Sequence, residues 1–218
     1  MLEDGRRKVV RCVDKCCRSQ YALAASAKMD QAIDPRKLLS NEEFSAVVRE
    51  TYKALDPIGI ALRFIAFTGC RLTESTLVRS GKYQTDGKIP MMKIPTIKRK
   101  GRPERSVDIH DPAFAEELGK WQKTIPDGQP LFAVAKRTMQ NRLQTVFKRL
   151  KIVKDALVHV FRHTRASQLS DAGFPLAYVV AQLGWSSMEM AKIYTHSNED
   201  QRLRLGGKLP KLTPPRKR

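Results

Sequence analysis

A histidine and an arginine stand three positions apart in His159-Val-Phe-Arg162, at the start of a segment with a helical pattern. At that spacing both side chains can project to one side of a helix near its N-terminus. The free N–H groups and the partial positive charge of a helix N-terminus favour a phosphate. The pair therefore indicates a phosphate site, although a capping histidine beside a solvent-exposed arginine would give the same pattern.

Other polar and aromatic residues with chemical potential lie far from this pair in the sequence. Arg71 follows the glycine that ends a nearly all-apolar segment, where an arginine is commonly a surface residue or pairs with an acid such as Glu74. Leu183-Gly-Trp185 precedes Tyr194-Thr-His196, and Trp185 stands nine positions before Tyr194. Taken singly, the tryptophan and the tyrosine are typical of a packed core or its rim.

Four motifs taken together resemble the tyrosine recombinase family, the phage-integrase type. They are Thr68-Gly-x-Arg71-x-x-Glu74, His159-x-x-Arg162-His163-Thr164, Leu183-Gly-Trp185 and Tyr194-Thr-His196. Their order, their intervals and their secondary-structure context match the family over roughly Leu38–Asn198. The resemblance implies a site-specific DNA recombinase or integrase with the catalytic-domain architecture of that family.

The reaction that the resemblance implies is a transesterification at a DNA phosphodiester. Tyr194 would attack the scissile phosphorus, which gives a 3′-phosphotyrosyl enzyme and a free 5′ hydroxyl. A second 5′ hydroxyl would then attack that link and rejoin the strands. The sequence has no GxxxxGK[ST] loop, and its motifs carry no carboxylate cluster for two magnesium ions, so we expect no cofactor and no catalytic metal.

The resemblance also assigns a role to each catalytic candidate. Arg71 and Arg162 would neutralise phosphate oxygens with planar, permanently charged guanidinium groups. His159 would accept a hydrogen bond or a proton from Tyr194, because a phenol with a pKa of about 10 benefits from an acceptor near neutrality. Trp185 replaces the histidine that is commoner in the family, and its indole N–H can only donate to the phosphate.

The family takes the general acid for the leaving 5′ oxygen from a lysine in the hairpin between its second and third strands. Lys98 and Lys100 both lie in the corresponding hairpin here. Alignment of Glu104–Ile109 with the strand after the turn favours Lys100, although a slip of the hairpin register would exchange the two lysines.

Three further polar residues, in or next to these motifs, are kept out of the catalytic set. Glu74 is interpreted as structural, orienting Arg71. His163 and Arg165 match poorly, in their roles, the acid or histidine that the family carries after its second arginine.

The elements that must position these residues are mainly helical. Capping residues, helix-ending glycines and apolar spacing predict helices over Ser40–Leu55, Pro57–Thr68, Asp111–Thr124, Thr138–Leu150, Val158–Ala172, Pro175–Leu183 and Ser187–Tyr194. Turn residues separate three predicted strands, Leu77–Tyr83, Met91–Ile97 and Arg105–Ile109. The predicted fold is mainly α with a small antiparallel three-stranded β-sheet inserted (α+β).

The predicted organisation has three parts. Residues 1–36 are a basic segment or linker with a helix, residues 37–198 are the catalytic domain, and residues 199–218 are a basic tail. Family members usually carry a whole helical DNA-clamping domain ahead of the catalytic one, so the chain is expected to be a fragment or one of the short forms. Cys12, Cys16 and Cys17 fit no zinc spacing, and reduced thiols are expected.

The charge of the chain indicates a polyanionic partner. Its 218 residues include 41 Lys+Arg and 22 Asp+Glu, a formal net charge of +19. Basic runs occur over Lys136–Lys154, over Lys93–Arg105 and after Glu199, and although one such run is usually solvated surface, three favour nucleic acid. No apolar run is long enough for a membrane helix and no secretory signal opens the chain, so we expect a cytoplasmic protein, nucleoid-associated or encoded by a phage or mobile element.

The resemblance implies double-stranded DNA as the partner, a homodimer on each site and a homotetramer in the synapse, with an accessory DNA-bending protein as a further candidate. Two alternatives stay open from the sequence. A type IB topoisomerase shares this chemistry but relaxes one duplex, and a basic DNA-binding protein on the same scaffold would have no catalytic activity.

Overall fold

The structure is a computed structural model, which describes residues 34–54, 56–97, 104–154 and 157–194. The predicted N-terminal helix, the predicted tail and the cysteines at positions 12, 16 and 17 lie outside these ranges. Both hairpin lysines, Lys98 and Lys100, also lie outside them, as does His196.

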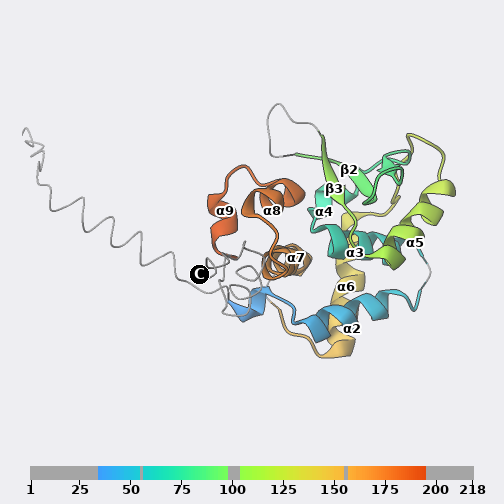
Figure 1. Ribbon diagram of the computed structural model, residues 1–218. Coiled ribbons are helices and arrows are strands. Elements are labelled where there is room, and N and C mark those ends of the chain that lie inside the picture. The colour runs from blue at the N-terminus through green and yellow to red at the C-terminus, as the bar shows by residue number, and fades with distance from the viewer. Residues whose placement is uncertain (1–33, 55, 98–103, 155–156, 195–218) are drawn as a thin grey trace, which may run out of the picture. The chain divides into compact units, whose positions relative to one another are not determined.

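Helices dominate the described part of the chain (Figure 1). They are η1 (Pro35–Lys37), α2 (Asn41–Thr51), α3 (Pro57–Thr68), α4 (Leu72–Ser75), α5 (Pro112–Lys123), α6 (Lys136–Leu150), α7 (His159–Asp171), α8 (Leu176–Leu183) and α9 (Glu189–Lys192). No helix within the described ranges is long and apolar enough to cross a membrane.

The apolar helix α3 lies at the centre of the main hydrophobic core. Its N-terminus is capped by Asp56, whose side chain accepts from the Gly59 N–H, and Gly69 ends it in the left-handed conformation at φ 64°. Helices α2, α6 and α7 all pack against it. Figure 1 shows α7 between α3 on one side and the α8–α9 pair on the other. The central helix therefore carries the Gly69–Arg71 turn into contact with elements from the second half of the chain.

Three short strands form an antiparallel sheet in the order β1-β2-β3. They are β1 (Tyr83–Gln84), β2 (Met91–Pro95) and β3 (Glu104–Asp108). Met92 pairs with both Tyr83 and Val107, and the buried side chains of β2 alternate along the strand, as expected for a sheet with one covered face. Because α8 packs against β3, the sheet reaches the helices that carry the C-terminal motifs.

A second, smaller hydrophobic cluster holds the C-terminal motifs. It joins α7, α8 and α9 through Leu169, Val179, Leu183 and Ala191. Trp185 and Tyr194 belong to this cluster, with only 4% and 2% of their surface exposed. Both aromatic candidates are therefore packed residues, whatever else they do.

The predicted fold class is confirmed, while several predicted elements have different bounds, and two of them differ most. Over the predicted strand Leu77–Tyr83, Arg79 forms an isolated bridge with Pro130, and strand pairing begins only at Tyr83. The predicted final helix, Ser187–Tyr194, shortens to α9, which has Met188 as its N-cap and ends at Lys192. Around Arg79, the Ser80 N–H donates to the Gln129 carbonyl and the Leu131 N–H donates to the Val78 carbonyl, long-range contacts that local patterns do not report.

Candidate active site

Arg71 is held in place by Glu74, as the sequence suggested. Arg71 is the N-cap of α4, and its backbone N–H donates to Glu74 Oε2 at 2.9 Å. Its guanidinium Nη1 donates to Glu74 Oε1 at 2.8 Å. Glu74 is completely buried, whereas the Arg71 side chain is 15% exposed. The carboxylate therefore fixes an arginine whose outer edge stays open to a ligand.

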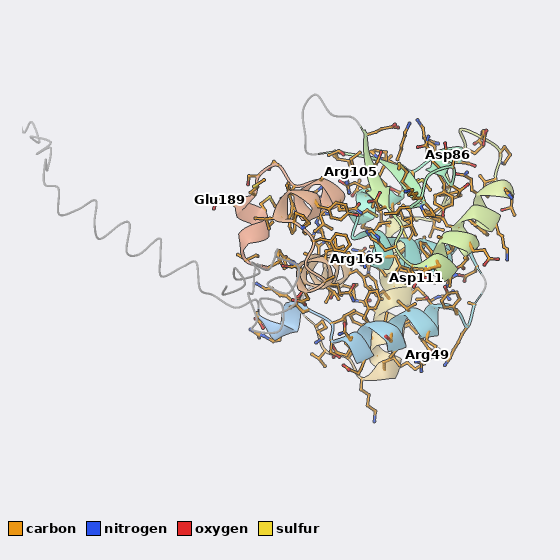
Figure 2. The ribbon with its side chains drawn as sticks, viewed as in Figure 1. Arg49, Asp86, Arg105, Asp111, Arg165 and Glu189 are labelled. Carbon is orange, nitrogen blue, oxygen red and sulfur yellow. The ribbon has the colours of Figure 1, made fainter. Side chains whose placement is uncertain are left out.

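A second arginine, Arg105 of β3, also holds the Glu74 carboxylate. Its Nη2 donates to Glu74 Oε2 at 2.9 Å, and its Nε donates to the Gln182 carbonyl at 3.1 Å. Figure 2 labels Arg105 where β3 approaches α8. The motifs do not single out Arg105, although it lies in the predicted strand after the hairpin, within the basic run Lys93–Arg105. Arg105 links the sheet, the Arg71 turn and the end of α8.

Arg162 is a buried cation that ties together the ends of two helices. Its Nη1 donates to the Gly69 carbonyl at 2.8 Å and its Nη2 donates to the Leu183 carbonyl at 2.6 Å. Its guanidinium lies 5.5 Å from the centre of the Trp185 ring. Only 5% of Arg162 is exposed. Carbonyl oxygens at the C-terminal ends of α3 and α8 carry partial negative charge, which stabilises a cation here.

The phenol of Tyr194 is packed against Trp185 and hydrogen-bonded to His163. The Trp185 and Tyr194 rings stack with centroids 5.4 Å apart and an interplanar angle of 17°. The Tyr194 hydroxyl hydrogen-bonds to His163 Nδ1, and Ser170 Oγ donates to the Tyr194 carbonyl at 2.6 Å. His163 was kept out of the predicted catalytic set because it matches poorly, in its role, the residue that the family carries after its second arginine. Its contact with Tyr194 joins α7 to a segment 31 positions away, which motif matching does not report.

One cavity unites the predicted catalytic residues that the structure describes. Its volume is about 340 Å³. Its lining includes Arg71, His159, Arg162, Trp185 and Tyr194. These residues come from segments far apart in the sequence, so their convergence is a property of the fold. The remaining predicted catalytic residue, Lys100, lies outside the described residues and has no observed position.

A larger hollow of about 740 Å³ adjoins this cavity and shares Arg71 and His159 with it. Lys136 and Gln140, from the first half of α6, also line it. The candidate site therefore has a second, larger hollow beside it, whose lining carries the basic side chains of Arg71 and Lys136.

Burial shifts the protonation equilibria of this site toward neutral forms. It raises the pKa of Tyr194 to about 12, against the opposing effect of the Arg162 charge. It lowers the pKa of Arg162 to about 10, and the charge of Arg71 lowers it further. Burial also lowers the pKa of His163, and His159 and Arg162 add to that shift. Near neutrality the site holds a protonated phenol, a charged guanidinium and a neutral imidazole.

Metal ligands and reactive thiols do not cluster in the described part of the chain. Over residues 34–54, 56–97, 104–154 and 157–194, no group of three or more His, Cys, Asp or Glu side chains could hold a metal ion. Cys70 is a buried free cysteine beside Arg71, and burial raises the pKa of its thiol to about 12. Such a thiol is an unreactive packing residue near neutrality.

Sequence relatives of this chain are recombinases. The sequence model described as the phage integrase family matches residues 39–201. Tyrosine recombinase XerC of Xanthomonas axonopodis pv. citri (strain 306) is 27% identical over 204 residues, covering 83% of this chain and 64% of the relative. XerC of Xanthomonas campestris pv. campestris (strain B100) is also 27% identical, and the match covers 83% of this chain and 61% of that relative. The chain thus spans less than two thirds of these curated relatives.

Solved structures share the fold of this chain. XerH site-specific recombinase bound to difH substrate superimposes with a TM-score of 0.61 at 20% identity, over 79% of this chain and 52% of that one. The catalytic domain of bacteriophage HP1 integrase gives a TM-score of 0.57 at 21% identity, over 78% of this chain and 95% of that domain. The fold is therefore that of a tyrosine recombinase catalytic domain. With the family match over residues 39–201, the chain belongs to the phage integrase family, the tyrosine recombinases.

Proposed function

We propose that this chain is a tyrosine-type site-specific recombinase that cuts and rejoins double-stranded DNA through a 3′-phosphotyrosyl intermediate. The observation that carries the proposal is the shared cavity, where two arginines, a histidine, a tryptophan and a tyrosine from distant segments meet. Family membership supports the same chemistry and favours neither of the two alternatives, DNA relaxation by a type IB topoisomerase and passive DNA binding.

In the proposed cleavage step, the Tyr194 oxygen attacks the scissile phosphorus and the bond from phosphorus to the 5′ oxygen breaks. Charge on the phosphoryl oxygens rises in the transition state, so cations that are fixed beforehand lower the barrier. Arg71 and Arg162 are such cations, because a buried carboxylate and two carbonyls already hold their guanidinium groups. Trp185 would donate its indole N–H to a phosphate oxygen, and Lys100 would protonate the leaving 5′ oxygen.

Double-stranded DNA is the proposed partner. The formal net charge of +19 favours a polyanion, and the hollow that continues from the cavity past Lys136 offers a path for the backbone beside the scissile phosphate. The solved XerH and Tn1549 integrase structures are described as complexes with DNA, which supports the same partner here. A homodimer on each site, a homotetramer in the synapse and an accessory DNA-bending protein belong to this proposal.

The experiment that tests the proposal is a covalent trap on nicked suicide substrates drawn from a DNA library. Loss of the short product beyond the nick prevents religation, so a cleaving enzyme accumulates as a denaturation-resistant protein–DNA adduct. We expect the adduct with the wild type and with Tyr52→Phe, whose hydroxyl contacts Glu117 away from the cavity. Tyr194→Phe should abolish the adduct and keep nearly unchanged DNA affinity, because only one hydroxyl is lost. An adduct with Tyr194→Phe would contradict the assignment.

A further inference from the structure

We propose that His163, and not His159, takes the proton of Tyr194 when the phenol attacks phosphorus. This inference rests on the proposed function, because it assigns a further catalytic residue to the same cleavage step. It departs from the role that the family resemblance gives to His159. Its basis is the direct contact between His163 and the reacting oxygen.

Tyr194 is held both at its backbone and at its ring, so the contact of its hydroxyl with His163 is part of a defined arrangement. Ser170 Oγ fixes the backbone carbonyl of Tyr194, and Trp185 stacks on the phenol ring. The hydroxyl then reaches His163 Nδ1, and the two rings lie 6.1 Å apart at 29°. His159, one turn earlier on α7, is exposed and lines both this cavity and the larger hollow.

A second histidine–tyrosine pair in this chain shows what decides the direction of such a hydrogen bond. The Tyr178 hydroxyl donates to Asp108 Oδ2 at 2.6 Å, so it can only accept from His110 Nε2 at 2.7 Å. The Tyr194 hydroxyl meets no carboxylate within the described residues, and its partner there is His163 Nδ1. A phenol is a stronger donor than a neutral imidazole N–H, and an imidazole nitrogen is a stronger acceptor than a phenol oxygen. The Tyr194 proton therefore points at Nδ1.

The surroundings of His163 keep its imidazole neutral and ready to accept. Burial lowers its pKa, and the groups that face it, His159, Arg162 and Lys37, lower it further. An acceptor must be unprotonated at the working pH and within hydrogen-bond reach of the proton it takes. His163 meets both conditions before DNA binds.

The step balances without a further reactant. The O–H bond of Tyr194 breaks and its proton binds His163 Nδ1 as the new oxygen–phosphorus bond forms. The bond from phosphorus to the 5′ oxygen breaks, and that oxygen takes a proton from a donor, which we assign to Lys100. In religation both protons return, so His163 gives its proton back to the phenol.

Paired substitutions at His163 separate proton transfer from positioning. His163→Asn places an amide oxygen near the Nδ1 position, which can accept the hydrogen bond but cannot take a proton near neutrality. His163→Leu removes both capacities. A general base contributes about 10² to 10⁴ in rate, so we expect both variants to form the suicide-substrate adduct at least about a hundredfold more slowly. His110→Asn is the matched control from the other histidine–tyrosine pair and should react at the wild-type rate.

The pH profile of adduct formation identifies which histidine is titrating. In the wild type, the rate should rise with pH while His163 loses its proton and then level off. His159→Asn should keep that acid limb at a lower overall rate, whereas His163→Asn should lack it. Retention of the limb in His163→Asn, or rescue of the wild-type rate by Asn at position 163, overturns the proposal while leaving the recombinase function intact. Absence of any wild-type adduct would instead count against the function.

A measurement without DNA keeps the proposal testable if the variants fold poorly. In nitrogen-15 spectra of the histidine-labelled full chain, His163 should be the neutral tautomer with its proton on Nε2. Tyr194→Phe should shift the His163 Nδ1 resonance and leave that of His110 unchanged. A proton on Nδ1 of His163, or no response to Tyr194→Phe, contradicts the proposal.

Discussion

At the scale of single residues, Arg162 is both charged and buried. The stability of the fold and the proposed cleavage step therefore depend on the same side chain. Its guanidinium satisfies the carbonyls of Gly69 and Leu183 while it lines the cavity. Lysine at this position would keep the charge, but its single ammonium cannot donate to both carbonyls and to a phosphate in one fixed plane.

We therefore expect Arg162→Lys to lower both activity and stability. Loss of one preorganised donor costs about 10² to 10³ in rate, and an unsatisfied buried carbonyl costs roughly 1–3 kcal/mol. Adduct formation and urea unfolding measure the two effects. Arg49→Lys, on an exposed side chain of α2 (Figure 2), should change neither. Wild-type activity in Arg162→Lys would contradict the assigned role.

The surroundings of the Glu74 carboxyl predict that the stability of the protein depends on pH. Burial raises its pKa, but the hydrogen bond and charge of Arg105 and the hydrogen bonds from Arg71 outweigh burial, so the pKa lies below the usual 4.5. A carboxyl with a lowered folded pKa stabilises the protein above its unfolded pKa and loses that contribution as pH falls through the folded value. The free energy of unfolding should therefore fall on acidification below about pH 4.5.

Glu74→Gln should flatten that acid dependence and slow adduct formation, because Arg71 loses its fixed partner. Urea unfolding over a pH series measures the first effect. Glu116→Gln is the control, since Glu116 pairs with Lys120 on the surface, where solvent screens the interaction. An equal acid dependence in the wild type and Glu74→Gln would show that Glu74 does not carry it.

At the scale of elements, two glycines in the left-handed conformation allow the close approach that forms the site. A Cβ on Gly69 would lie 2.5 Å from Leu183 Cδ2, and a Cβ on Gly184 would lie 2.8 Å from Arg105 Cζ. These turns end α3 and α8, whose last carbonyls hold Arg162 and Arg105.

Gly69→Ala should lose stability and activity together. The left-handed backbone alone costs an alanine roughly 1–2 kcal/mol, and the contact with Leu183 adds to it. Gly128→Ala is a matched control, because Gly128 also has a positive φ, 78°, but its Cβ would meet nothing within 4 Å. We expect Gly128→Ala to lose only the backbone contribution and to keep wild-type adduct formation. Equal losses in both variants would argue against close packing at Gly69.

Elements with strong local signals could be predicted from the sequence. Ser40 and Glu43 form a capping box where capping residues predicted the start of a helix, and Gly69 ends α3 where expected. The bounds of the final helix were predicted wrongly, and so was the strand over Leu77–Tyr83, where Arg79 bridges to the distant Pro130. The same holds for the site. The family resemblance named the candidate residues that line the cavity, whereas the contact of His163 with Tyr194 depends on how α7 packs against a segment 31 positions away.

At the scale of the whole molecule, the formal net charge of +19 predicts how DNA binding responds to salt. Each phosphate neutralised by Lys or Arg releases condensed counterions, so affinity falls steeply as salt rises. We expect binding to weaken on the order of a thousandfold from low to moderate salt. Fluorescence anisotropy with a labelled duplex measures this response, and a flat titration would mean that the basic runs do not contact the backbone.

The central claim is that the phenol of Tyr194 becomes covalently linked to a DNA phosphate. Trypsin should release Tyr194 in the peptide Ile193–Arg202, in which it is the one tyrosine. Mass spectrometry of a nuclease-trimmed adduct should find the nucleotide mass on Tyr194 in that peptide. A nucleotide on any other residue, or an adduct that leaves Ile193–Arg202 unmodified, would contradict the account.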